Sequence, residues 1–189
     1  MTRPLRLLLC CLAAMAGLLL SGCGEKQDIR TIGETEGLYV NVAGLTYQVQ
    51  VSRYLNADDI EDRDYLRGLS PGDDELGDGE TWFGVFVRVH NDGNEPLPSA
   101  EDFEIHTTQE EVFEPVEIDE ADNVFAYRPR VLASGDLLPH PDSAAGYGPI
   151  GGELLLFKVD YEALQNRPLE LHIISPENPD EQALVDLDV

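Results

Sequence analysis

Apolar and polar residues alternate with a period of two through much of this chain, which is the pattern of half-buried β-strands. The segments with this alternation are 38–42, 45–52, 83–90, 103–107, 169–173 and 185–189, and a further short strand is expected around Phe113. The segment 152–159, GELLLFKV, is instead almost continuously apolar, as in a strand that is buried on both faces. The pattern therefore predicts about seven or eight short strands.

No amphipathic helix is evident after the first 22 residues, so the expected fold is all-β. Chain length and strand spacing favour an antiparallel β-sandwich of the immunoglobulin-like kind over a barrel. Two long irregular segments interrupt the strands: 56–79, which is acidic, and 127–151, which is rich in proline and glycine. Loops of this length in a compact domain are usually functional or disordered.

The N-terminal residues differ from the rest and indicate a secretory signal. Arg3 and Arg6 precede an apolar stretch, 7–20, that is shorter than the ~20 residues of a membrane-spanning helix. The stretch ends in Leu-Ser-Gly followed by Cys23, and this order resembles the lipobox of bacterial lipoproteins. The alternative is a cleaved signal followed by an incidental cysteine.

This interpretation gives the domain organisation. We predict a lipoprotein signal peptide at 1–22, a flexible tether at 23–37 that follows the lipidated Cys23, and a single sandwich domain at 38–189. The protein would then be held by lipid on the extracytoplasmic face of the cell membrane. The other two cysteines lie inside the signal, so no disulfide is expected in the mature chain.

The charge balance limits the partners of the mature protein. Twelve lysines and arginines, less Arg3 and Arg6, remain against 37 aspartates and glutamates, which is a formal charge of −27. Such a surface repels nucleic acid and anionic headgroups, and it suits cations, basic partners or simple solubility. We expect no nucleic-acid partner.

A resemblance to a known family rests on residues 82–116, WFGVFVRVHNDGNEPLPSAEDFEIHTTQEEVFEPV. This segment is similar to the centre of telokin-like, immunoglobulin-fold domains of unknown function in bacterial lipoproteins of the actinobacterial type. Those domains have a strand ending in a V-x-N-x-x-x-x-P turn and a D-F-x-I strand. The resemblance implies an immunoglobulin-like sandwich and implies no activity.

No motif of an enzyme or a cofactor site is evident. The chain has no G-x-S-x-G, phosphate-loop or H-E-x-x-H motif, so we expect no catalytic residue and no cofactor. The four histidines, His90, His106, His140 and His172, lie on separate predicted elements, without the short spacing that brings two imidazoles together. We expect surface histidines rather than a zinc or copper site.

Two weaker candidate sites remain. The 56–80 segment is dense in carboxylates, and Asp73, Asp74 and Asp78 are candidate calcium ligands, although the order of an EF-hand loop is absent and a solvated loop is the expectation. Trp82 and Phe86 lie on the opposite face of their strand from the main apolar set. Those two aromatics should be covered by a loop or else form a binding patch.

The function that these observations favour is a non-catalytic, lipid-anchored module that binds or scaffolds an unidentified protein of the cell envelope. The alternative is an extracytoplasmic lipoprotein that binds a small ligand or calcium through the acidic 56–80 loop.

Overall fold

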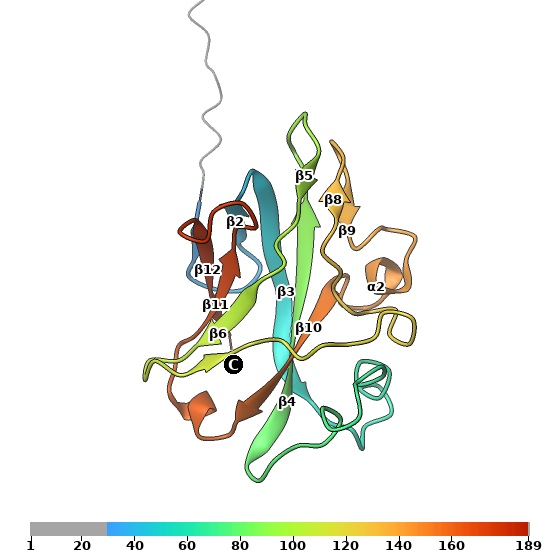
Figure 1. Ribbon diagram of the computed structural model, residues 1–189, viewed down its shortest axis with the longest axis vertical. Coiled ribbons are helices and arrows are strands. Elements are labelled where there is room, and N and C mark those ends of the chain that lie inside the picture. The colour runs from blue at the N-terminus through green and yellow to red at the C-terminus, as the bar shows by residue number, and fades with distance from the viewer. Residues whose placement is uncertain (1–29, 189) are drawn as a thin grey trace, which may run out of the picture.

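The computed structural model describes residues 30–188, which form a β-sandwich of two five-stranded sheets (Figure 1). The first sheet, here sheet A, has the strand order β1-β12-β11-β6-β7, and the second, sheet B, has the order β10-β4-β3-β2 with β9 joined to β4. The predicted signal peptide, Cys23 and most of the predicted tether lie outside the described residues.

The elements have the following bounds. The strands of sheet A are β1 (Ile32–Gly33), β6 (Phe103–His106), β7 (Val112–Phe113), β11 (Leu169–Ile174) and β12 (Gln182–Leu187). The strands of sheet B are β2 (Tyr39–Val42), β3 (Leu45–Leu55), β4 (Glu80–His90), β9 (Leu137–Leu138) and β10 (Glu153–Asp160). A small ribbon of β5 (Leu97–Pro98) and β8 (Val131–Leu132), the short helix α2 (Ala144–Tyr147) and the 3-10 turn η1 (Ala163–Gln165) complete the fold.

The main core lies between the two sheets and is built by the alternating positions. Phe83, Val85, Val87 and Val89 of β4 are completely buried and face the apolar residues of β6, β11 and β12. The all-β sandwich expected from the sequence is therefore confirmed, and its immunoglobulin-like detail stays a prediction. Tyr47 of β3 also lies in this core, where burial raises its pKa to about 12.

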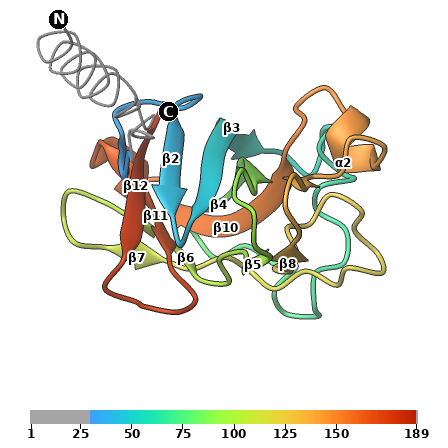
Figure 2. The same ribbon diagram turned by 90° about the horizontal axis from the view of Figure 1, so that it is seen from above.

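A second apolar cluster packs against the other face of sheet B. Its buried members are Leu55, Tyr65, Trp82, Phe86, Leu154 and Leu156, and segments from 56–79 and 115–125 cover them. Seen from above, these covering segments and α2 lie on the opposite side of β4 and β10 from β11 and β12 (Figure 2). Strand β10 thus contributes to both clusters, as its continuous apolar sequence predicts.

A β-bulge in β3 changes which face its residues occupy. The alternation predicts that Val51 lies on the same face as Tyr47 and Val49, but the pairing with β4 shifts register between Val49 and Val51. Two residues of β3 therefore correspond to a single step of β4, and Val51 packs against the second cluster. A period-of-two pattern cannot reveal this extra residue, because Gln50 and Val51 both suit a strand.

Strand β1 lies within the segment predicted to be a tether. Ile32 and Gly33 pair in parallel with Leu184 and Val185 of β12, and Gly33 is buried. Further along, the Glu36 carboxylate accepts hydrogen bonds from the Ser52 N–H at 3.0 Å and the Asp188 N–H at 3.1 Å. Main-chain pairing holds this polar segment, so its lack of apolar periodicity misled the sequence-based boundary.

Candidate functional site

The aromatic pair predicted as a binding patch is not at the surface. Trp82 is 3% exposed and Phe86 is 1% exposed, because both lie under the loops of the second cluster. The Phe86 ring makes an edge-to-face contact with Tyr65, with ring centroids 5.0 Å apart. The binding-patch interpretation of Trp82 and Phe86 is therefore wrong, and the alternative that a loop covers them holds. Burial of two large rings is the favourable outcome when a nearby loop carries apolar residues.

The three candidate calcium ligands are exposed on the 56–79 loop. Asp73, Asp74 and Asp78 face solvent, and Asp74 accepts a hydrogen bond from the Gly72 N–H at 2.9 Å within its own turn. No group of three or more His, Cys, Asp or Glu side chains between residues 30 and 188 is arranged to hold a metal ion. The buried carboxylate of this loop is instead Asp62, which forms an ion pair with Arg53 of β3.

Two histidines meet, contrary to the sequence-based expectation. His106 of β6 and His172 of β11 stack with ring centroids 3.8 Å apart and ring planes 13° apart. Antiparallel pairing places His106 opposite Glu170 and His172 opposite Glu104, so residues that are remote in sequence become neighbours. Each Nε2 atom faces the glutamate of its own strand, at 2.6 Å for Glu104 and 3.1 Å for Glu170. The expected isolation of the histidines is therefore wrong.

This face of sheet A is crowded with carboxylates. Asp186 of β12 lies opposite Glu170 in the pairing of β11 with β12. Partial burial raises the pKa of Asp186, and the charges of Glu170, Asp188 and Glu34 add to the effect. The ionised form of Asp186 is thus disfavoured in the folded state.

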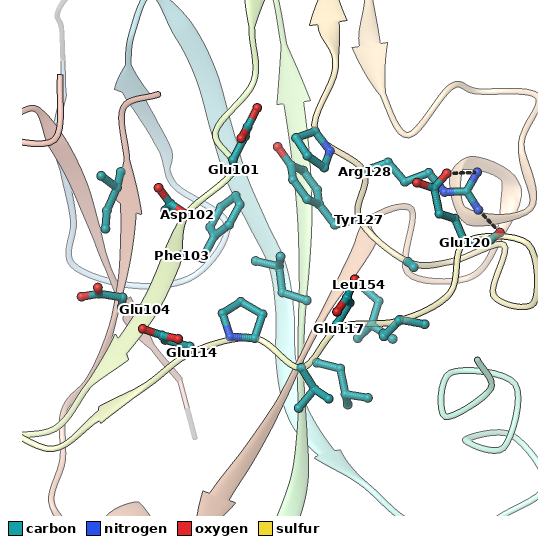
Figure 3. A pocket seen from close by; sticks show the side chains of 18 of the residues that line it. Glu101, Asp102, Phe103, Glu104, Glu114, Glu117, Glu120, Tyr127, Arg128 and Leu154 are labelled. Atoms are coloured by element: carbon teal, nitrogen blue, oxygen red, sulfur yellow. Dashed lines mark hydrogen bonds and ion pairs between the residues drawn. The ribbon is translucent and has the colours of Figure 1, made fainter. Parts of the chain in front are cut away.

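An open groove of about 700 Å³, here called the acidic groove, lies between β6 and β10 (Figure 3). This volume lies within the range of ~300–1,000 Å³ that is usual for ligand sites. It is formed by three neighbouring stretches of the chain, 101–104, 114–120 and 126–129, together with 154–156 of β10. Ile174 and Pro179 complete the lining.

Main-chain hydrogen bonds to β10 fix the floor of the acidic groove. Leu154 donates from its N–H to the Phe125 C=O at 2.7 Å, and its own C=O accepts from the Tyr127 N–H at 2.9 Å. Two residues later, the Leu156 C=O accepts from the Val116 N–H at 2.7 Å. Two loop segments are thereby attached to the same edge of sheet B, and the groove lies where they separate.

Tyr127 forms one wall and is held rigidly. Its hydroxyl donates to the Ala100 C=O at 2.8 Å, while the Ala100 N–H donates to the Tyr47 hydroxyl at 2.7 Å. Its ring packs edge-to-face on Phe103, with centroids 5.0 Å apart. Burial, assisted by the nearby Tyr47, raises the pKa of Tyr127 well above its ordinary value. This hydroxyl is therefore a structural donor rather than a reactive group.

A buried carboxylate fixes the segment that follows Tyr127. Glu153 at the start of β10 forms an ion pair with Arg130 at 2.6 Å and accepts a hydrogen bond from the Arg128 N–H at 3.3 Å. Burial raises the pKa of Glu153, although the arginine charge opposes this shift. The pair thus holds this wall of the groove against β10.

Carboxylates surround the opening of the groove. The acidic residues that line it are Glu101, Asp102, Glu104, Glu114, Glu117 and Glu120, and all except Glu104 are exposed. Arg128 is the one lysine or arginine in the lining, and its guanidinium lies 3.4 Å from the Glu120 carboxylate (Figure 3). The opening is therefore strongly negative and the floor is apolar.

The sequence did not predict this groove. Its carboxylates come from 101–104 and from 114–120, which are short acidic stretches, whereas the longest run rich in acids is the 56–80 loop. Only the attachment of both segments to β6 and β10 brings them face to face. The local signal was present as acids next to prolines and apolar residues, in EDFE and EPVE, but such stretches are common at surfaces.

Comparisons with known proteins give weak structural likenesses. No protein-family model matches the sequence, and no curated protein matches it. The structure is similar to the yjhA protein of Bacillus subtilis, at 11% identity and a TM-score of 0.46, over 82% of this chain and 99% of that one. It is also similar to ycdA, a provisionally assigned lipoprotein of Bacillus subtilis, at 11% identity and 0.45, over 78% of this chain and 38% of that one.

A third likeness is to an uncharacterized β-sandwich protein of Clostridium difficile, at 10% identity and a TM-score of 0.41, over 87% of this chain and 99% of that one. None of the three descriptions names an activity. The telokin-like, actinobacterial-type resemblance gains no support from these comparisons and stays a prediction.

Proposed function

We propose that this protein is a lipid-anchored module of the cell envelope that binds another protein through the acidic groove and has no catalytic role. The observation that carries the proposal is the groove itself, which is an open cavity with a fixed main-chain floor. No serine, threonine, cysteine, histidine or lysine lines it, and the Tyr127 hydroxyl is already engaged. A lining without these groups suits binding better than catalysis by a hydroxyl, thiol, imidazole or amine nucleophile.

The anchor is part of the proposal. Cys23 lies outside the described residues, and the described chain begins seven residues after it, close to β1. Between residues 30 and 188, no helix is long and apolar enough to cross a membrane. Acyl chains on Cys23 would hold the domain at the membrane surface, because each buried CH₂ contributes ~0.8 kcal/mol. Cys23→Ala should therefore release the protein from membrane fractions, and retention of that variant in the pellet would contradict lipid anchoring.

A block of the groove tests the binding role. Pro129 is exposed and lines the groove, so Pro129→Trp places a large side chain at the opening. Pro71→Trp, on the exposed 56–79 loop, is the matched control. The full lipidated protein should capture an envelope protein that is lost with Pro129→Trp and kept with Pro71→Trp, while thermal unfolding shows that both variants are folded. Equal capture by the two variants would refute a binding role for the groove.

A further inference from the structure

We infer that the occupant of the acidic groove is an extended, basic segment of a partner protein, in which lysine or arginine alternates with apolar residues. This inference rests on the proposed function and adds the chemistry of the partner. Three features of the groove support it: the unbalanced charge of its opening, its apolar floor and the distribution of its carboxylates over different sides.

The charge of the opening is not neutralised within the protein. Glu101, Asp102, Glu114 and Glu117 have no cationic partner among residues 30–188. Four exposed carboxylates with no cationic partner around one cavity repel each other, and a cationic ligand relieves that repulsion. Complementary charge is thus available to a partner without breaking an existing pair.

Arg128, the cation in the lining, already has partners within the protein. The Arg128 guanidinium pairs with Glu120 at 3.4 Å and also donates to the Asn123 C=O at 3.2 Å. It stabilises the 120–128 loop from inside and leaves the rest of the opening without positive charge. An acidic or anionic ligand would therefore meet six carboxylates and no free cation in the described lining.

Because the floor is apolar, a ligand that makes only ionic contacts would not fit the groove best. Val116, Ile118 and Ile174 are half-buried and line the cavity, so each keeps some apolar surface in contact with water. An apolar side chain of the ligand would cover that surface and remove it from water, which favours binding. Side chains of an extended peptide alternate in direction, so one set can reach the floor while the next reaches the carboxylates.

The arrangement of the carboxylates argues against a single metal ion. They lie on different sides of the groove: Glu101 and Asp102 precede β6, while Glu114 and Glu117 follow β7 (Figure 3). Within residues 30–188, no three His, Cys, Asp or Glu side chains converge on one point. Charges distributed along a groove match charges distributed along a chain.

Fluorescence anisotropy with labelled octapeptides tests this inference on the full lipidated protein in non-ionic detergent. The probe alternates lysine with valine, and the comparison peptides alternate lysine with serine and glutamate with valine. We expect the lysine–valine peptide to bind most tightly. Glu114→Gln with Glu117→Gln should weaken its binding about tenfold, as expected when two charge pairs are lost.

The control is Asp73→Asn with Asp74→Asn, which removes the same charge from the exposed 56–79 loop and should change binding less than about twofold. Equal weakening by both pairs would overturn the inference, because net charge alone would then explain binding. Equal affinity for the lysine–serine peptide, or displacement by spermidine at the same concentration as by free peptide, would also overturn it, since the floor would have no role.

The outcome is separable from that of the proposed function. If Pro129→Trp abolishes capture of the envelope partner while the Glu114 and Glu117 double variant captures it normally, the groove binds a protein but not through basic residues. In that case the inference is wrong and the proposed function stands. If Pro129→Trp leaves capture intact, the proposed function is wrong.

Discussion

Phe86 tests whether the second apolar cluster holds the 56–79 loop. The side chain is 1% exposed and contacts Tyr65 of that loop, with ring centroids 5.0 Å apart. Truncation of a buried phenylalanine to alanine costs about 3–5 kcal/mol, since it removes apolar contact and leaves a cavity. For a domain of this size each kcal/mol shifts the unfolding midpoint by roughly 2–4 °C, so Phe86→Ala should lower it by about 6–20 °C.

Phe86→Ala should increase opening of the 56–79 loop more than it increases unfolding of the whole domain. Arg63 and Arg67 are exposed on either side of Tyr65, which is itself buried, so the loop carries trypsin sites next to its anchor. Loss of the Phe86 ring weakens that anchor, and local opening exposes these bonds to the protease. Limited trypsin digestion at a temperature well below the midpoint should therefore cut Phe86→Ala within 63–68 faster than the wild type.

Tyr147→Ala provides the control, because Tyr147 is 89% exposed and its loss removes an aromatic ring from the surface only. Its unfolding midpoint should stay within about 2 °C of the wild type, as for ordinary surface substitutions. If Phe86→Ala behaves like Tyr147→Ala in both assays, the second cluster contributes no stability and the covering role of the loop is refuted.

Two further predictions concern surface carboxylates. Because the folded state raises the pKa of Asp186, its contribution to stability is fully present at low pH and is lost as the pH rises through the folded-state pKa. Asp186→Asn should therefore increase the free energy of unfolding at pH 7 by up to about 0.5 kcal/mol and leave it unchanged at pH 3, as measured by thermal unfolding at both pH values. A loss of stability at pH 7 would contradict this. Changing Asp73, Asp74 and Asp78 together to Asn should change stability by at most about 0.5 kcal/mol per site. Millimolar calcium should shift the wild-type midpoint no more than magnesium at equal ionic strength does; a calcium-specific shift that the triple variant lacks would establish a metal site.

The strands of the sandwich could be predicted because each one carries its own signal. Alternation in 83–90 places Val85, Val87 and Val89 in the main core, and the continuous apolar run of 153–159 marks the strand that serves both clusters. These are local properties, in which side-chain direction follows from the period of the strand alone. Strand β1 could not be predicted, because a two-residue strand that is held by main-chain hydrogen bonds has no periodic pattern.

The sites depend on pairings that no local pattern encodes. His106 and His172 meet only because β6 and β11 are adjacent and antiparallel in one particular register. The acidic groove likewise needs Val116 and Tyr127 to attach to β10 at positions two residues apart. The sequence shows where the acidic residues are, but it does not show which of them line a cavity. Exposed carboxylates of the 56–80 loop and of the groove have similar sequence surroundings.

The bulge in β3 gives this strand an unequal tolerance of length changes. Val49 and Val51 pair with consecutive residues of β4, so Gln50 is the surplus residue between them. A deletion of Gln50 would restore a regular ladder and leave both halves of the strand facing as they do now. A deletion two positions before or after Gln50 would move the residues between the deletion and the bulge to the opposite face of the sheet. Their core-facing and loop-facing side chains would then exchange places. Homologous chains that differ in length within β3 should therefore differ at this position, and the loop docked by Arg53 and Leu55 would be inherited unchanged.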